Sequence, residues 1–477
     1  MPDTASPPPA PEAPTKQAVV LIHGIGEQRP MATLWKLVEL VWTKAPRAPG
    51  APPRAVYSEP DEMSGVFELR RLSANQNAYG KRTDFFEYYW AHLMHGNEWR
   101  DVIAWLSNLA TRRRQQVPPQ LHKAWRIIRT AAFVAPFFLF AFSGGAIFSG
   151  ATGDQVSFAI LAFLLLIGFG VLILLDQLFF SPVLGDAARY LRPTPKNIAC
   201  RQEIRARGLA LLEALHASGK YDRIVLVGHS LGGVIAYELV CHLWGRRHRE
   251  LALSGAVAEA LATVEAAGLV LRANPQDREA QAGWRAAQTA YHEALRHAPG
   301  AHWLITDLVT LGSPIAHADT LIATDPDEFR LLTERREILT APPFYETFAD
   351  GRQRFSYCRT PGRADDPDAV PRAPHNSAAF AAVRWTNIYF PMQGVMRGDL
   401  IGGPVARIFG PGVVDVAARA PRAGGWFPHL DYFRLDDDGP WGDPAWVDHR
   451  VALRTALGLE TAPQTAVAES APVYRSV

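Results

Sequence analysis

Short runs of apolar, β-branched or aromatic residues alternate along this chain with longer stretches in which apolar residues recur at helical spacing. Buried strands are predicted for four runs, at 16–22, 85–90, 303–311 and 384–390, and for the run that leads from Tyr221 into Gly228-His-Ser230. Amphipathic helices are predicted at 31–44, 201–218 and 443–457. A strand–helix rhythm of this kind is typical of an α/β protein, with a mostly parallel sheet and helices on both of its faces.

Two long apolar segments interrupt this rhythm. No charged residue occurs in the 24 positions of 130–153 or in the 21 positions of 155–175, and only Asp154 separates the two. Because a membrane-spanning helix needs about 20 apolar residues, the pattern predicts a transmembrane helical hairpin over 130–180. Pro136 and a glycine pair leave open whether the first segment fully spans the bilayer. The alternative is a buried hairpin in a soluble core.

Basic residues flank this predicted hairpin on both sides, while its tip carries one acidic residue. They are Arg112, Arg113, Arg114, Lys123, Arg126 and Arg129 before it, and Arg189, Arg192, Lys196 and Arg201 after it. The positive-inside rule therefore predicts that both flanks, and the rest of the chain with them, are cytoplasmic. Richness in alanine, arginine and proline suggests a GC-rich bacterial genome, which would make the membrane the inner one.

The remaining chain divides by composition. We expect one α/β domain in two parts, 16–129 and 181–459, with a disordered leader (1–15) and a disordered tail (460–477), both rich in small residues and proline. An alanine-rich helical pair at about 250–299 is predicted to be an insertion, serving either as a lid or as packing.

Overall charge and cysteine content exclude several classes of function. The formal net charge of +2 gives no reason to expect nucleic-acid binding. The three cysteines lie far apart, so they predict neither a disulfide framework nor a metal site. We expect no cofactor and no metal, and the oligomeric state is left open.

The candidate chemistry centres on the turn that follows the run beginning at Tyr221. There Gly228-His-Ser230-Leu-Gly232 joins a β-branched run to a helix-forming run, which is the context of a nucleophile elbow. Its serine is exposed on a strained turn, and the N–H of Leu231 lies at the start of the new helix. The alternative is a glycine-rich turn needed only for tight packing. A second turn, His23-Gly24-Ile25-Gly26, follows the first strand and could supply another oxyanion donor from Ile25 or Gly24.

A serine nucleophile needs a general base and an acid that orients it, and elbow hydrolases carry them in the order serine, acid, histidine. His429 is the preferred base because it follows the last apparent core strand, with His375 and His317 as alternatives. Asp399 is the preferred acid because it lies in the glycine-rich loop after the strand at 384–390. Three other aspartates remain alternatives, namely Asp415, Asp431 and Asp319.

Taken together, these motifs resemble the α/β-hydrolase superfamily, specifically its lipase and GPI-inositol-deacylase-like branch. The matching stretches begin at Val19 (VVLIHGIGEQ), Leu226 (LVGHSLGG), Leu308 (LVTLGSPI), Trp385 (WTNIYFPMQGVMRGDLIGGPV) and His429 (HLDYF). The resemblance covers about half of the chain and implies an α/β-hydrolase fold, interrupted here by the membrane hairpin. It also implies that the aspartate after the W-x-N-x-Y strand, Asp399, is the catalytic acid.

The sequence as a whole predicts a membrane-anchored serine hydrolase with the triad Ser230, His429 and Asp399. Its expected partners are the bilayer and a carboxylic ester substrate of the lipid or long-chain acyl class, since tethering concentrates the enzyme near such substrates. Two alternatives belong to other classes: an acyltransferase on the same fold, and a membrane scaffold that keeps the fold without catalysis.

Overall fold

The computed structural model describes the chain in fifteen pieces, at residues 16–25, 29–46, 53–75, 82–93, 190, 195–251, 255–297, 303–323, 325–360, 362–363, 366, 371–393, 398–422, 428–435 and 440–459. The predicted membrane hairpin (130–180), leader (1–15) and tail (460–477) lie outside these residues. No helix within the described ranges is long and apolar enough to cross a membrane.

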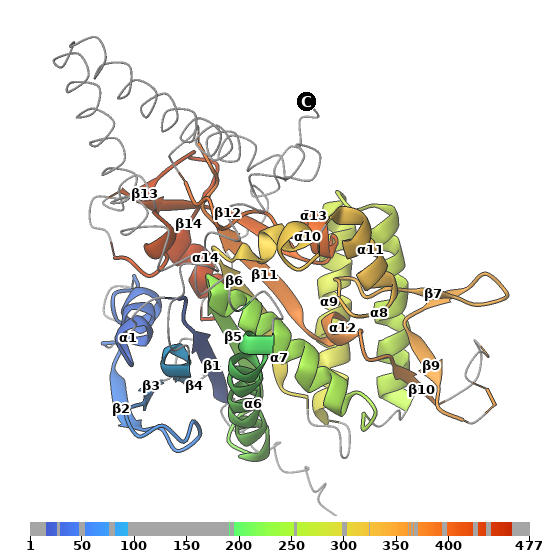
Figure 1. Cartoon of the computed structure of the whole chain (residues 1–477), viewed down its shortest axis with the longest axis horizontal. Helices are drawn as coiled ribbons and strands as arrows, with labels where there is room; N and C mark the ends of the chain where they lie inside the picture. The colour runs from blue at the N-terminus through green and yellow to red at the C-terminus, as the bar shows by residue number, and fades with distance from the viewer. Residues whose placement is uncertain are drawn as a thin grey trace, which may run out of the picture.

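A twisted sheet of ten strands forms the centre of the molecule (Figure 1). Its parallel part runs in the order β4, β1, β5, β6, β11, β12. These strands are β4 (Arg82–Tyr88), β1 (Lys16–Ile22), β5 (Arg223–His229), β6 (Ile305–Leu311), β11 (Arg384–Tyr389) and β12 (Val414–Pro421). The predicted α/β class, with a mostly parallel central sheet and helices, is therefore confirmed. In this order β5 lies in the interior of the sheet, so its carboxyl end is flanked by the ends of β1 and β6.

Shorter strands extend both edges of the sheet. At one edge β2 (Val56–Pro60) pairs antiparallel with β3 (Arg70–Ala74), which in turn pairs antiparallel with β4. At the other edge β12 pairs antiparallel with β13 (Pro440–Trp441) and parallel with β14 (Val447–Asp448). Two small hairpin sheets lie apart from the main one: β7 (Glu346–Thr347) with β8 (Gln353–Arg354), and β9 (Ser356–Cys358) with β10 (Arg372–Pro374).

Two hydrophobic clusters cover the two faces of the sheet, because successive side chains of a strand point to opposite faces. On β1, Val20 and Ile22 join the cluster under α6 (Pro195–Ala217) and α7 (Leu231–Arg247), whereas Val19 and Leu21 join the other cluster. That second cluster is covered by α1 (Ala32–Val38), the π-helical turn η1 (Glu39–Thr43) and α14 (His449–Ala456). Burial on both faces explains why the strands read as continuous apolar runs.

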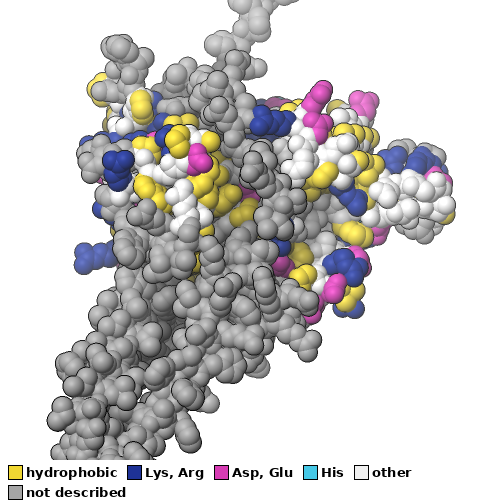
Figure 2. Space-filling model, turned by 90° about the horizontal axis from the view of Figure 1, so that it is seen from above, with side chains coloured by type: hydrophobic (Ala, Val, Ile, Leu, Met, Phe, Trp, Pro, Cys, Tyr) yellow, Lys and Arg dark blue, Asp and Glu magenta, His cyan; other side chains and the backbone are white. Residues whose placement is uncertain are grey.

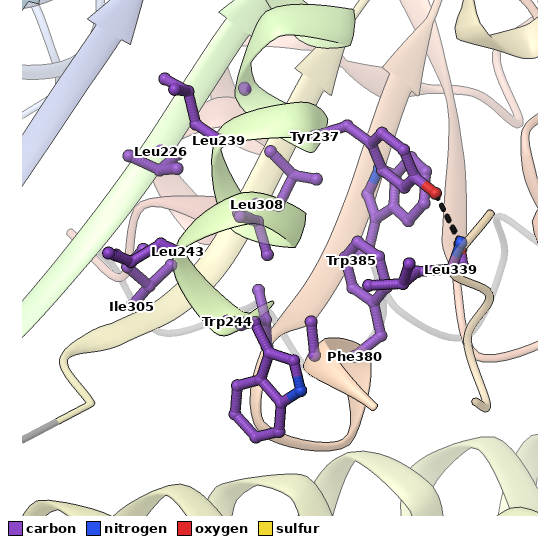
Figure 3. Packing of buried hydrophobic residues seen from close by; sticks show 14 of the residues in the cluster. Leu226, Tyr237, Leu239, Leu243, Trp244, Ile305, Leu308, Leu339, Phe380 and Trp385 are labelled. Carbon is purple, nitrogen blue, oxygen red and sulfur yellow. Dashed lines mark hydrogen bonds between the residues drawn. The ribbon is translucent and has the colours of Figure 1, made fainter. Parts of the chain in front are cut away.

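Aromatic side chains fix α7 against the sheet and its neighbours. Figure 3 shows Tyr237 of α7 beside Trp385 and Phe380. Tyr237 stacks on Phe380 with ring centroids 5.7 Å apart, and its hydroxyl is bonded to the main chain of Leu339, at 2.8 Å from the amide nitrogen and 2.9 Å from the carbonyl oxygen. Because α7 begins directly after β5, this packing also fixes the turn between them.

The predicted helical pair at about 250–299 consists of α8 (Gly255–Ala273) and α9 (Arg278–His297), which lie side by side (Figure 1). On α9, Gln288 donates to the carbonyls of Phe380 and Val383, and Arg285 donates to that of Trp385. These acceptors lie around α12 (Ala379–Ala382) and the first residues of β11, at the amino end of the strand. The contacts of α9 therefore favour packing, and not a lid over the carboxyl end of the sheet where Ser230 lies.

Further short helical segments lie after β6, among them η8 (Pro428–Leu430). Four others are η6 (Pro314–His317), α10 (Ala318–Leu321), α11 (Pro326–Glu334) and α13 (Ala406–Phe409). On the face seen in Figure 2, the basic side chains of the described residues are interspersed with acidic and apolar ones. The described residues on that face form no patch of one charge sign, which agrees with the small net charge of the chain.

Candidate active site

Ser230 occupies a strained turn between β5 and α7. Its φ and ψ are 53° and −126°, a left-handed backbone that a residue with a side chain seldom adopts. The N–H of Ser230 donates to the carbonyl of Leu311 at the end of β6, at 2.9 Å. This hydrogen bond therefore attaches the turn to the sheet at Ser230 itself.

Glycines around Ser230 are required by close backbone contacts. A Cβ on Gly232 would lie closer than 3.0 Å to the carbonyl oxygens of Ile22 and His23, and a Cβ on Gly228 would meet the backbone of Gly233 equally closely. Neither clash can be relieved by rotating a side chain, because the atoms met belong to the main chain. This geometry is the one expected of a nucleophile elbow.

The structure brings Ser230, His429 and Asp399 together in one hydrogen-bonded chain. Oγ of Ser230 lies 3.0 Å from Nε2 of His429, and Nδ1 of His429 lies 3.0 Å from each carboxylate oxygen of Asp399. A carboxylate only accepts, so Nδ1 carries the proton and Nε2 is free to accept from the serine hydroxyl. All three residues are at most 2 % exposed. These three residues, which lie up to 199 positions apart in the sequence, thus form one buried hydrogen-bonded relay.

Asp399 is held by several donors besides His429. The N–H of Ile401 donates to its Oδ1 at 2.8 Å and the hydroxyl of Tyr432 to its Oδ2 at 2.9 Å, while its own N–H donates to the carbonyl of Phe390. Burial by itself would raise the pKa of Asp399, but the His429 ring and these hydrogen bonds hold that pKa below its usual value. The carboxyl therefore remains an anion beside His429 at neutral pH.

The structure engages the alternative histidines with other partners. Nε2 of His375 contacts the carbonyl of Phe344 at 3.0 Å, and Nδ1 of His375 contacts the hydroxyl of Ser377 at 2.9 Å. His317 is buried in η6, where burial and, after it, the charge of Arg407 lower its pKa to about 4. Neither ring contacts the hydroxyl of Ser230.

The three alternative aspartates are also engaged elsewhere. The carboxylate of Asp415 accepts from the side chain of Asn387 and from the N–H groups of Val405 and Ala406. Asp319 pairs with Arg407, and Asp431 pairs with Arg434. Of the four aspartates considered, Asp399 alone contacts His429 among the described contacts.

The residues proposed for an oxyanion site lie next to Ser230. Leu231 is the first residue of α7, so its N–H has no acceptor within the helix. On the other side, a Cβ on Gly24 would lie 3.0 Å from Cβ of Ser230. The carbonyl of Gly24 accepts from Nδ1 of His23 at 2.7 Å, and because a trans peptide directs its N–H opposite to its C=O, the N–H of Ile25 points away from the His23 ring.

His23 is itself fixed by Trp90. The two rings stack with centroids 5.3 Å apart, and the indole N–H donates to the main-chain carbonyl of His23 at 2.9 Å. Burial lowers the pKa of His23 to about 4, so the ring is neutral and donates through one nitrogen only. The turn that carries Gly24 is thus anchored to the end of β4.

Three residues of this site were not identified from the sequence: Tyr432, His229 and Trp90. Tyr432 follows His429 by three positions, a spacing that lets one tight turn direct both side chains to the same carboxylate. His229 precedes Ser230, and its Nε2 lies 2.9 Å from the main-chain carbonyl of His429. The spacing of His429 and Tyr432 could have indicated Tyr432 from the sequence. The contact of His229 joins residues 200 positions apart, so no local sequence pattern indicates it.

The described residues hold no cluster of three or more His, Cys, Asp or Glu side chains arranged to bind a metal ion. Comparisons with models of protein families, with curated proteins and with solved structures found no match to this chain.

Proposed function

We propose that this chain is a serine hydrolase of the α/β-hydrolase type that cleaves carboxylic esters. The observation that carries the proposal is the hydrogen-bonded chain from Asp399 through His429 to Ser230, on an elbow with positive φ. A hydroxyl is a weak nucleophile at neutral pH, and this relay supplies the base that it lacks. A turn needed only for packing would not require a buried histidine and a buried carboxylate aligned on one serine.

The proposed reaction begins when the Ser230 proton passes to Nε2 of His429 and Oγ attacks the ester carbonyl carbon. Asp399 stabilises the positive charge that forms on His429. The N–H groups of Leu231 and Ile25 are proposed to bind the oxyanion of the tetrahedral intermediate. His429 then protonates the leaving alcohol, which gives the acyl-enzyme. Water, activated by the same histidine, releases the acid and regenerates the serine.

A lipid or long-chain acyl ester is the proposed substrate, and the bilayer is the proposed site of action. This part of the proposal rests on the charge-free segments within 130–180 and on the basic residues that flank them. With those flanks inside the cell, the catalytic domain would be cytoplasmic, at the inner membrane of a bacterium. No cofactor or metal has a role in this scheme.

Labelling by a fluorophosphonate tests the nucleophile and its base. We expect the native chain, solubilised in detergent, to be labelled, and Ser230→Ala and His429→Ala to lose the label. Ser377→Ala is the matched control, because Ser377 is also a buried serine beside a histidine and should leave labelling unchanged. A native chain that resists the probe while a known hydrolase reacts would favour the non-catalytic scaffold.

The substrate class and the acceptor need separate measurements. We expect faster turnover of long-chain esters presented in vesicles than of soluble short-chain esters. Equal rates on short esters with no activity on vesicles would contradict the lipid proposal. Product analysis with added alcohols then distinguishes the classes, because a free acid identifies a hydrolase and a new ester identifies an acyltransferase.

A further inference from the structure

His229, the last residue of β5, lies where three chain segments of the candidate site meet. It immediately precedes Ser230. A Cβ on Gly24 would lie 3.0 Å from its Nδ1, which places the turn after β1 against one side of the ring. The other side faces the turn at 428–433, with ring centroids of His429 and Phe433 at 5.2 Å and 5.5 Å.

A hydrogen bond joins this ring to the main chain of the residue proposed as the base. Nε2 of His229 donates to the backbone carbonyl of His429 at 2.9 Å, which fixes the tautomer because a carbonyl can only accept. Burial, together with the nearby His429, lowers the pKa of His229 to about 3. The ring therefore stays neutral and adds no positive charge beside His429 when that side chain takes up the serine proton.

Besides the bonds of the His429 ring, Tyr432 and the main chain at position 429 also attach this turn to the rest of the site. The Tyr432 side chain reaches Asp399, and the main chain at position 429 reaches His229. One attachment would leave the turn free to pivot, whereas several attachments restrain its rotation and its distance from Ser230. Since both ring nitrogens of His429 must meet their partners at about 3 Å, small movements of this turn would break the relay.

We propose that His229 is a positioning residue, which fastens the turn bearing the base to the serine elbow through its bond to the His429 carbonyl. The inference rests on the proposed function, because it assigns a role within the same reaction. His229 touches neither substrate nor reacting atoms in this scheme. Its contribution is the placement of His429, and errors of about 1 Å in placing a catalytic group can lower rates by about a hundredfold.

Two substitutions separate positioning from bulk packing. His229→Leu removes the donor and keeps an apolar side chain, whereas His229→Gln places an amide N–H near the position of Nε2. We expect His229→Leu to lower kcat by about 10- to 100-fold with little change in KM, and His229→Gln to recover most of that loss. Rates are normalised to the folded fraction measured by circular dichroism.

His216→Leu is the matched control. His216 is likewise buried and bonded to the main chain, but its Nε2 accepts from Leu304 just before β6, at the other end of the strands from Ser230. This variant should lose stability without a comparable loss of kcat per folded molecule. An unchanged kcat in His229→Leu, or equal losses in the Leu and Gln variants, would overturn the proposal.

Hydrogen–deuterium exchange gives a second readout that does not depend on activity. We expect faster exchange over 428–435 in His229→Leu than in the native chain, and no such change in His216→Leu. Unchanged exchange at 428–435 would contradict the positioning role even if the native chain proved inactive. Absence of fluorophosphonate labelling in the native chain would instead count against the proposed function, so the two failures are distinguishable.

Discussion

The hydroxyl of Tyr432 donates to Oδ2 of Asp399 at 2.9 Å and accepts from the N–H of Phe390 at 3.1 Å. One phenol thus connects the carboxylate of the candidate relay to Phe390, the residue directly after β11. The ring stacks on Phe390 with centroids 4.1 Å apart, so its position does not depend on the hydroxyl alone. Tyr432 and His429 come from the same turn and reach the same carboxylate.

Removal of this hydroxyl should lower activity more than stability. We expect Tyr432→Phe to reduce kcat about tenfold, since a hydrogen bond to a charged group contributes roughly 1.5–3 kcal/mol. Tyr237→Phe is the matched control, because the Tyr237 hydroxyl is also buried but bonds to the main chain of Leu339, away from Asp399. Steady-state kinetics of the two variants measures their kcat values. Equal kcat values would exclude a role for Tyr432 in the relay.

Asp399→Asn tests which carboxylate orients the base. An amide in place of the carboxylate can donate to Nδ1 of His429 and so favours the wrong tautomer, and we expect kcat to fall by about 10⁴-fold. Asp415→Asn serves as the control, because Asp415 is also buried but bonds to Asn387, Val405 and Ala406. A larger loss of kcat in the Asp415 variant would reassign the acid.

The elbow itself can be tested at one glycine. Gly232→Ala puts a methyl group against the carbonyls of Ile22 and His23, so we expect a loss of fluorophosphonate labelling and destabilisation by more than about 2 kcal/mol. Gly245→Ala, near the other end of α7, meets nothing within 4 Å and should stabilise the helix by roughly 0.4–1 kcal/mol. Thermal unfolding measures the stability of the two variants. A Gly232→Ala variant with native stability and native labelling would show that the turn has room for a methyl group at this position.

Glu87 should make stability depend on pH. It is fully buried at the end of β4, where one carboxylate oxygen accepts from the N–H of Met31 and burial raises the pKa from 4.5 to about 7. A carboxyl whose pKa is higher in the folded state favours folding fully below its unfolded pKa, and this contribution is lost as pH rises through the folded value. We therefore expect the free energy of unfolding to fall between about pH 5 and pH 8, by on the order of 3 kcal/mol.

Glu87→Gln is the variant that checks this assignment. The amide keeps an oxygen that can accept from Met31 but does not ionise, so the fall in stability over that pH interval should shrink. Denaturant unfolding at pH 5 and at pH 8 measures both proteins. A native chain whose stability is flat over this interval would show that Glu87 does not ionise as its burial indicates.

The central strands were predictable because burial on both faces makes them continuous apolar runs. The run at 16–22 matches β1 to the residue, the run from Tyr221 to the serine turn contains β5, and the run at 303–311 begins two residues before β6. The edge strands β2 and β3 were missed, since their exposed, charged residues carry little apolar pattern. β12 was missed because alanines and charged residues interrupt its apolar positions.

The site residues that the sequence indicated are those with a local motif. Ser230 lies between two glycines, and Asp399 and His429 follow identifiable strands or turns. The residues that orient them have no such local signature. His229 and Trp90 act through bonds to the main chain of distant residues, 200 and 67 positions away, and such contacts exist only once the sheet has assembled.

Leu93, after β4, lies beside the helix that leads back into the sheet. Its carbonyl contacts Sγ of Cys200 on α6 at 3.2 Å, and the hydroxyl of Tyr88 donates to the carbonyl of Ile204 on the same helix. The chain therefore leaves the sheet and returns to it at neighbouring points, although more than a hundred positions separate Leu93 from Cys200. The contacts of Leu93 and Tyr88 with α6 therefore help to set where this helix starts its path toward β5.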